Sequence, residues 1–577
     1  MKRYWKYIKP YLSSFIIGPL LMIVEVIGEI VLPKCMSMII NVGTVEGNVP
    51  FIVKMGLLMV GIAVLMALGG IGGAYFGAKA SINFAADMRK DAFSKVQQYS
   101  FANIDKFSTG SLVTRLTNDI TQVQNLVNMM LRMMLRAPGM LIGAVIMAFI
   151  MNRRLAVIIL VVIPVLVVAI AIVIKTAFPR FQALQAKIDK LNSTIRESLT
   201  NVRVIKSFVR DDYEEAKFVE ANRDLKDSGL RAFKVMITVS PLMALAMNLT
   251  TLAVVWYGGK QIIVGDMLVG DLTAFITYVT QILMSLIMLS FIILQSSRAI
   301  ASAKRINEVL DCEVDINDEK AKETDKKVTK GAIRFENVTF RYYKDSEEPV
   351  LDKINLDIKA GETVGIIGST GCGKTTLVQM IPRLYDTDDG NVYVDGVNVR
   401  DYSLKNLRDG VAMVLQKNVL FSGSITENLC WGDENATDEQ IKEAARLAQA
   451  DGFVTGFENG YETDLGQGGV NVSGGQKQRL CIARAMLKKP KILILDDSTS
   501  AVDTATEREI RENLKTYCPD TTKIIIAQRI SSVIEADKVV VMDDGAIVGL
   551  GTHDELIKTC EAYQEIYYSQ MDKEVGA

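Results

Sequence analysis

The sequence predicts a chain in two parts: an α-helical membrane domain of six spans with long cytoplasmic helical extensions, followed by an α/β domain built around a phosphate loop. Hydrophobic residues make up 49% of the 577 residues and the mean hydropathy is +0.22, too apolar for an ordinary soluble protein. Charged residues still reach 23%, so an apolar part is averaged with a polar one. The net charge of −1 gives no reason to expect a nucleic-acid partner.

Six apolar stretches match the roughly 20 residues that a membrane helix needs. Four of them contain no charged residue, namely 55–78, 155–174, 235–259 and 272–297. The other two are residues 12–33, which include Glu25 and Glu29, and a stretch that starts at Ala137 and meets Arg153 early. The basic N-terminus precedes an apolar run without a small-residue cleavage site, which favours a retained first membrane helix.

Glu25 and Glu29 lie one helical turn apart on one face of the first span. Ionisable groups in membrane spans usually face a cavity or the bundle interior and count as functional candidates. The alternative is a position near the outer, water-filled end of a wide cavity, with no specific ligand.

The two longest connectors join spans two to three and four to five, and both are rich in Lys and Arg. Positive charge therefore predicts that these connectors, the N-terminus and the C-terminal half lie in the cytoplasm of a multi-pass protein of the plasma (inner) membrane. The connectors also mix polar and apolar residues at helical spacing, which predicts helical extensions below the membrane.

The composition divides the chain into three segments. We expect a membrane domain at 1–306, a strongly polar linker at 307–330 and a second domain at 331–577. In the second domain, β-branched runs at 333–340, 363–367 and 492–495 alternate with helical stretches, which indicates an α/β fold with buried strands.

A complete phosphate-loop pattern, GSTGCGKT, lies between the apolar strand TVGII and a helix-like segment. Its glycines allow backbone N–H groups to surround the phosphates of ATP, while Lys374 would reach the β- and γ-phosphates and Thr375 would bind Mg²⁺. The ATP-binding residues expected here are Gly368, Ser369, Thr370, Gly371, Cys372, Gly373, Lys374, Thr375 and Thr376. A second apolar strand ends in Asp496 and Asp497, and the carboxylate of Asp496 is the expected Mg²⁺ holder.

Between these two elements lies NVSGGQKQR, in which two glycines open a helix. This segment closely resembles the signature motif of ATP-binding-cassette (ABC) proteins, with Val472 in place of the usual leucine. The resemblance covers essentially the whole chain and implies that an opposite subunit's ATP is contacted by Ser473, Gly474, Gly475 and Gln476.

The same resemblance assigns roles to further residues. Tyr342 matches the aromatic residue that stacks on adenine, and Gln416 matches the loop glutamine that contacts Mg²⁺ and senses the membrane domain. We expect both residues to take part in ATP binding. Asp503 ends the SAVD loop (500–503), which crosses to the opposite subunit in the family, whereas His553 belongs to a stretch with no catalytic role.

The membrane half resembles ABC exporters rather than importers. The segments 107–119 and 197–208 look like the two cytoplasmic coupling regions of exporter half-transporters, and both lie in the long connectors. A membrane half fused ahead of the ATPase half is also an exporter arrangement.

Three residues depart from the family pattern. Asp497 replaces the glutamate that positions the attacking water, Gln528 replaces the switch histidine, and Gln467 replaces a glutamate of a loop thought to pass motion between the halves. When a catalytic group is displaced by about 1 Å, the reaction rate falls on the order of 100-fold. We therefore expect this chain's own site to bind ATP and to hydrolyse it poorly.

Because the signature motif is nearly intact, the chain can complete a site on a partner. The resemblance is to the degenerate-site subunit of bacterial heterodimeric multidrug exporters, which implies a second ABC half-transporter, membrane lipid and a small amphipathic substrate as partners. The alternatives are a homodimeric lipid or peptide exporter and a non-transporting regulatory ABC ATPase.

Overall fold

The computed structural model describes residues 2–344, 346–497 and 502–575. By their internal contacts these residues form two compact units. The first contains 1–97 and 110–311, and the second contains 98–109 and 312–577. The helical segment at 98–109 therefore packs with the second unit, although the sequence on both sides of it belongs to the first.

The first unit is entirely helical in its described part. Its main helices are α1 (Lys2–Ile8), α2 (Leu12–Met38), α3 (Val49–Gln97), α5 (Thr109–Thr114), α6 (Ile120–Met133), α7 (Arg136–Met151), α8 (Arg153–Thr200), α9 (Val202–Ser207), α10 (Asp211–Val264) and α11 (Val269–Asp311). Short turns of 3-10 or π helix lie at η1 (Lys9–Tyr11), η2 (Ile39–Thr44) and η3 (Arg115–Asp119).

Five helical stretches among the described residues are long and apolar enough to cross a membrane. They are Arg3–Thr44, Val49–Gln97, Thr109–Met151, Arg153–Thr200 and Val269–Ile292. The predicted span 235–259 lies within the single long helix α10, which is not among the five. The count of six spans is therefore not confirmed, and the sixth stays a prediction.

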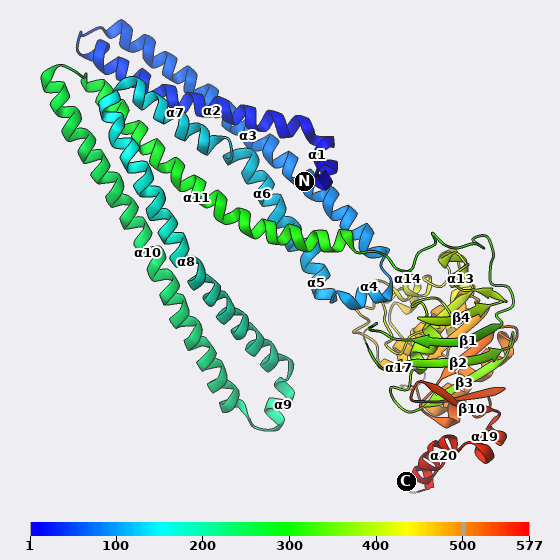
Figure 1. Cartoon of the computed structure of the whole chain (residues 1–577). Helices are drawn as coiled ribbons and strands as arrows, with labels where there is room; N and C mark the ends of the chain where they lie inside the picture. Colours follow the sequence, from blue (N-terminus) through cyan, green and yellow to red (C-terminus); the bar gives the residue numbers. More distant parts are fainter. Residues whose placement is uncertain (1, 345, 498–501, 576–577) are drawn as a thin grey trace. The chain divides into compact units, whose positions relative to one another are not determined.

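The connector between the predicted spans 155–174 and 235–259 is helical, as the sequence predicts. Helices α8 and α10 run side by side and are joined by α9 (Figure 1). Polar pairs tie the two helices together near α9: Ser198 donates to Glu214 at 2.7 Å, and Lys217 donates to Glu197 at 3.0 Å. The predicted coupling segment 197–208 thus includes the whole of α9 at the end of a braced helical pair.

The second unit contains two sheets. Its strands are β1 (Ile333–Phe340), β2 (Leu351–Ile358), β3 (Thr363–Gly368), β4 (Asp389–Val394), β5 (Val397–Asn398), β6 (Val411–Val414), β7 (Ile492–Asp496), β8 (Thr522–Ile526), β9 (Lys538–Asp543) and β10 (Ala546–Gly551). Its helices are α4 (Phe101–Lys106), α12 (Lys374–Gln379), α13 (Leu404–Asp409), α14 (Ile425–Leu429), α15 (Asp438–Leu447), α16 (Asp451–Val454), α17 (Gly474–Leu487), α18 (Thr504–Tyr517), α19 (His553–Thr559) and α20 (Glu561–Val575), with 3-10 turns η4 (Gly460–Glu462) and η5 (Ile530–Ser532).

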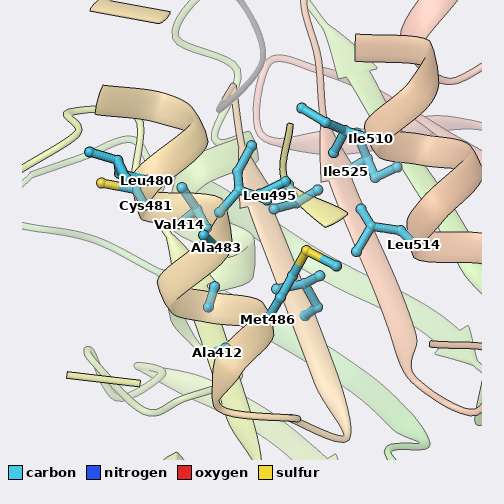
Figure 2. Close-up of a cluster of buried hydrophobic side chains, with 14 of the residues drawn as sticks. Ala412, Val414, Leu480, Cys481, Ala483, Met486, Leu495, Ile510, Leu514 and Ile525 are labelled. Atoms are coloured by element: carbon cyan, nitrogen blue, oxygen red, sulfur yellow. The ribbon is translucent and has the colours of Figure 1, made fainter. Parts of the chain in front are cut away.

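The larger sheet has the order β10-β9-β3-β8-β7-β6, and all of its pairs except β10–β9 are parallel. Strands β7 and β8 are buried at every residue, as expected of parallel strands covered on both faces. Side chains of α17 and α18 meet those of β6, β7 and β8 in one buried cluster that covers a face of this sheet (Figure 2). This packing holds the carboxyl ends of the strands at one rigid edge.

Candidate nucleotide site

The predicted ATP residues follow the carboxyl ends of four adjacent parallel strands. The phosphate loop follows β3, Gln416 follows β6, Asp497 follows β7 and Gln528 follows β8. Because neighbouring parallel strands end at the same edge, the topology brings together residues that are far apart in the sequence.

The phosphate loop depends on glycine at specific positions. Gly373 has φ +94°, and a Cβ there would lie 2.7 Å from the carbonyl oxygen of Val350. A Cβ at Gly368 would lie only 2.0 Å from the oxygen of Met542. The ammonium group of Lys374 lies against the loop and donates to the carbonyl oxygens of Gly368 and Ser369 at 2.8 and 2.7 Å. Within the loop Ser369, Thr370 and Gly371 are exposed, whereas Cys372 and the following Thr376 are buried.

Thr375 and Asp496 meet at the point where the sequence predicts a Mg²⁺ ion. The Thr375 hydroxyl donates to Oδ1 of Asp496 at 3.0 Å, and the buried Oδ2 has no hydrogen-bond partner among the described residues. Burial raises the pKa of the Asp496 carboxyl, although the bond from Thr375 opposes the shift. A buried carboxylate oxygen without a donor, next to a threonine hydroxyl, is a donor set that fits a divalent cation.

The two substituted residues contact each other. Nε2 of Gln528 donates to Oδ2 of Asp497 at 2.8 Å, and the side chain of Gln416 also hydrogen-bonds this carboxylate. Asp497 has φ +48°, in the left-handed region that few non-glycine residues adopt. Burial raises the pKa of Asp497 despite these two bonds. The carboxylate is therefore held by two glutamine amides.

Tyr342 lies next to Thr376, just after the phosphate loop. Its hydroxyl lies 2.9 Å from that of Thr376, and its ring packs edge-on against Phe340 and Tyr385 at centroid distances of 5.0 and 5.3 Å. The side chain remains 43% exposed. The partly exposed ring can take part in stacking on a base, and the role of Tyr342 toward adenine stays a prediction.

Tyr385 connects this aromatic group to α4. Its hydroxyl donates to Asp105 at 2.7 Å and its ring packs against Phe101 at 5.9 Å. Burial, together with the Asp105 carboxylate, raises the pKa of Tyr385. Helix α4 lies just before the segment 107–119, whose coupling role stays a prediction. No motif singled out Tyr385 or Asp105.

Replacing Tyr385 by phenylalanine should loosen α4. A hydrogen bond to a carboxylate stabilises by about 1.5 kcal/mol, so we expect amide hydrogen exchange in 98–109 to accelerate on the order of tenfold. Tyr461 donates to Asp451 at the same 2.7 Å elsewhere in the unit, so Tyr461→Phe is a matched control that should leave this segment unchanged. Equal exchange in wild type and Tyr385→Phe would contradict the role of the bond.

The signature residues Ser473 and Gln476 form a capping box at the start of α17. Ser473 accepts from the backbone N–H of Gln476 at 3.3 Å, and the Gln476 side chain accepts from that of Ser473 at 2.9 Å. Ser473 and Gly474 are exposed. Asp503, also exposed, caps α18 through the N–H of Thr506 at 2.9 Å, while Ser500 and Ala501 lie outside the described residues. The sole histidine, His553, bonds the Tyr563 hydroxyl at 2.8 Å.

In the first unit, Glu25 and Glu29 share a partner that the sequence did not indicate. Arg136, at the start of α7, lies 3.2 Å from Glu25 and 2.6 Å from Glu29. Gln281 of α11 donates to the backbone oxygen of Glu29 at 2.9 Å. The carboxylates thus pair within the helix bundle, as ionisable groups in membrane spans generally do.

Comparisons with known proteins match both units. Residues 15–286 match the family model described as ABC transporter transmembrane region, and residues 351–500 match the one described as ABC transporter. The chain is 39% identical to the ABC transporter ATP-binding protein YfiB of Bacillus subtilis (strain 168), over 100% of this chain and 99% of that protein. It is 33% identical to the putative multidrug export ATP-binding/permease protein YgaD of the same organism, over 99% of both chains.

Two further matches are a lipid flippase and a solved exporter structure. The ATP-dependent lipid A-core flippase of Desulfotalea psychrophila is 33% identical over 84% of each chain. A solved bacterial Atm1-family ABC exporter with ATP bound superposes with a TM-score of 0.79, at 24% identity and 98% coverage of both chains, which shows a shared fold. The chain therefore belongs to the ABC transporter family, as a multi-pass exporter subunit whose ATP-binding domain lies in the cytoplasm.

Proposed function

We propose that the chain is the degenerate-site subunit of a heterodimeric ABC exporter that moves amphipathic compounds out of the cytoplasm. Its own site binds ATP and hydrolyses it poorly, while its signature motif completes the working site of a different partner. The observation that supports this most directly is the bond between Gln528 and Asp497, the two positions where the family has histidine and glutamate.

ATP binding uses residues that match the family pattern. Tyr342 stacks on adenine, the loop amides surround the phosphates, and Lys374 exchanges its bonds to two loop carbonyls for the β- and γ-phosphates. Thr375, Asp496 and Gln416 would hold Mg²⁺, which neutralises charge on the phosphates when bound.

Hydrolysis needs a base or positioning group beside the γ-phosphate. The Asp497 side chain is one methylene shorter than glutamate, and the amides of Gln416 and Gln528 restrain its carboxylate. Gln528 can donate a hydrogen bond to a phosphate oxygen but cannot carry a proton or a positive charge. Both departures weaken the hydrolysis step. The site therefore binds ATP and cleaves it slowly.

The need for a different partner follows because each ATP site of an ABC transporter is formed by residues of two subunits. A homodimer of this chain would have two weak sites, whereas a partner with glutamate and histidine at the matching positions would supply one strong site. The exposed residues Ser473 and Gly474 are available to complete that site. An amphipathic cargo is consistent with the multidrug and lipid descriptions of two relatives.

Measuring ATP turnover with the chain alone and with its candidate partner tests this proposal. We expect slow turnover from the chain alone and brisk turnover from the pair, with native mass giving two different subunits. Lys374→Ala should abolish ATP binding at this chain's site, while Lys405→Ala, at an exposed lysine of α13, serves as control. Brisk turnover by the chain alone that is lost in Lys374→Ala would contradict a degenerate site and favour a homodimer.

A further inference from the structure

The side-chain amide of Gln570, in the C-terminal helix α20, is bound at both ends to the segment that contains Gln528. Its Nε2 donates to the backbone oxygen of Gln528 at 2.8 Å, and its Oε1 accepts from the backbone N–H of Ile530 at 2.9 Å. One planar amide thus pairs with a carbonyl and an N–H two residues apart, as a neighbouring β-strand would. The side chain of Gln528 donates at the same time to Asp497.

Helix α20 is itself firmly anchored in the second unit. Tyr563 is fully buried and belongs to the same hydrophobic cluster as Ile530 and Leu556. Its hydroxyl lies 2.8 Å from Nδ1 of His553. Ile566 packs against that cluster from the same helix face. Gln570 follows Tyr563 by two helical turns, so the anchored face delivers its amide to the segment after β8.

We propose that Gln570 is a positioning residue for the switch segment, through which α20 sets the place of Gln528 relative to the γ-phosphate of ATP. This inference rests on the proposed role of Gln528 at that phosphate. It makes the C-terminal helix part of the nucleotide site, because any displacement of α20 moves the carbonyl of Gln528 and the N–H of Ile530 together. Gln570 itself touches no reacting atom.

The two bonds can be separated by substitution. Gln570→Ala removes both, while Gln570→Glu keeps the length and the acceptor for Ile530 but replaces the donor to Gln528 with a carboxylate oxygen. Glu565→Gln changes an exposed residue of the same helix and is the matched control. All variants are made in the full-length transporter, purified with its partner, and checked for assembly by size exclusion.

The first measurement is amide hydrogen exchange of the 528–532 segment without nucleotide. In Gln570→Ala we expect the Ile530 amide to exchange on the order of tenfold faster, since its only described acceptor is lost. In Gln570→Glu and Glu565→Gln it should exchange as in wild type. Wild-type exchange of Ile530 in Gln570→Ala would overturn the proposal.

The second measurement is the ratio of ATP to ADP affinity at this chain's site, with Gln528→Ala as reference. Both Gln570→Ala and Gln570→Glu should lower the ratio, because a displaced Gln528 no longer meets the γ-phosphate. A ratio that falls in Gln528→Ala but not in the Gln570 variants would overturn the positioning role alone. A ratio unchanged in Gln528→Ala would overturn the proposed role of Gln528, and the positioning role with it.

Discussion

Replacing Asp497 by glutamate together with Gln528 by histidine should raise ATP turnover at this chain's site on the order of 100-fold. Glutamate restores the missing methylene, so its carboxylate reaches further from the backbone than that of Asp497. Histidine restores a group beside the γ-phosphate that can carry a positive charge. The effect is measured in the assembled transporter, with the partner's own strand-end glutamate replaced by glutamine so that this site dominates turnover.

The two substitutions should not act independently. Gln528 bonds the Asp497 carboxylate at 2.8 Å, so each residue is placed by the other. Glutamate alone would extend its carboxylate past the amide that now holds it, and histidine alone would face a carboxylate that is too short. We therefore expect each single change to recover much less than half of the gain in activation free energy, as is usual for residues in contact.

One control identifies the site responsible. Adding Lys374→Ala to the double variant should return turnover to its low level, because the restored hydrolysis depends on ATP at this chain's phosphate loop. If the double variant stays as slow as the single ones, the defect lies elsewhere, for instance in the partner's signature motif.

The position of the candidate nucleotide site could be predicted from the sequence because its motifs follow the ends of strands. The phosphate loop, Asp496 and Gln528 lie at the same edge once β3, β7 and β8 are parallel neighbours, and the contact between Thr375 and Asp496 follows from that order. Their roles toward ATP and Mg²⁺ stay predictions, since they rest on the motifs.

The residues that support the site could not be predicted in the same way. Tyr385 and Asp105 are 280 positions apart, and Gln570 and Gln528 are 42 apart. Each contact depends on the exact approach of two elements, and none of Tyr385, Asp105 and Gln570 belongs to a motif with a known spacing. Arg136 was missed as the partner of Glu25 and Glu29 for the same reason, since only the packing of α2 on α7 brings them together.

The charged pair of Asp119 and Arg305 should stabilise the first unit, and substitutions of its two residues should differ in effect. Asp119 ends the predicted coupling segment, and its side chain is only 4% exposed. It accepts from the Ser302 hydroxyl at 2.8 Å and from Nε of Arg305 at 2.7 Å, and it contacts Nη2 of the same guanidinium. Arg305, in contrast, is 46% exposed.

Removing the arginine should therefore cost more than neutralising the acid. Arg305→Ala leaves the buried Asp119 carboxylate with a single hydroxyl donor. We expect this change to lower the free energy of unfolding by about 3 kcal/mol. Asp119→Asn leaves a guanidinium that water can reach, at about 1 kcal/mol. The outer pair of Arg115 and Glu308 at 2.8 Å provides the control, because Glu308→Gln changes an exposed partner and should shift the melting temperature least.

Thermal unfolding of the detergent-solubilised transporter ranks the variants by their loss of stability. Arg305→Ala should lower the melting temperature clearly more than Asp119→Asn, and combining the two changes should recover part of that loss, because no buried charge is then left without a partner. Equal losses for the two single variants, or a combined loss equal to their sum, would mean that the pair stabilises only through packing. The expected asymmetry would instead identify the Asp119 carboxylate as the buried group that fixes the end of the predicted coupling segment to α11.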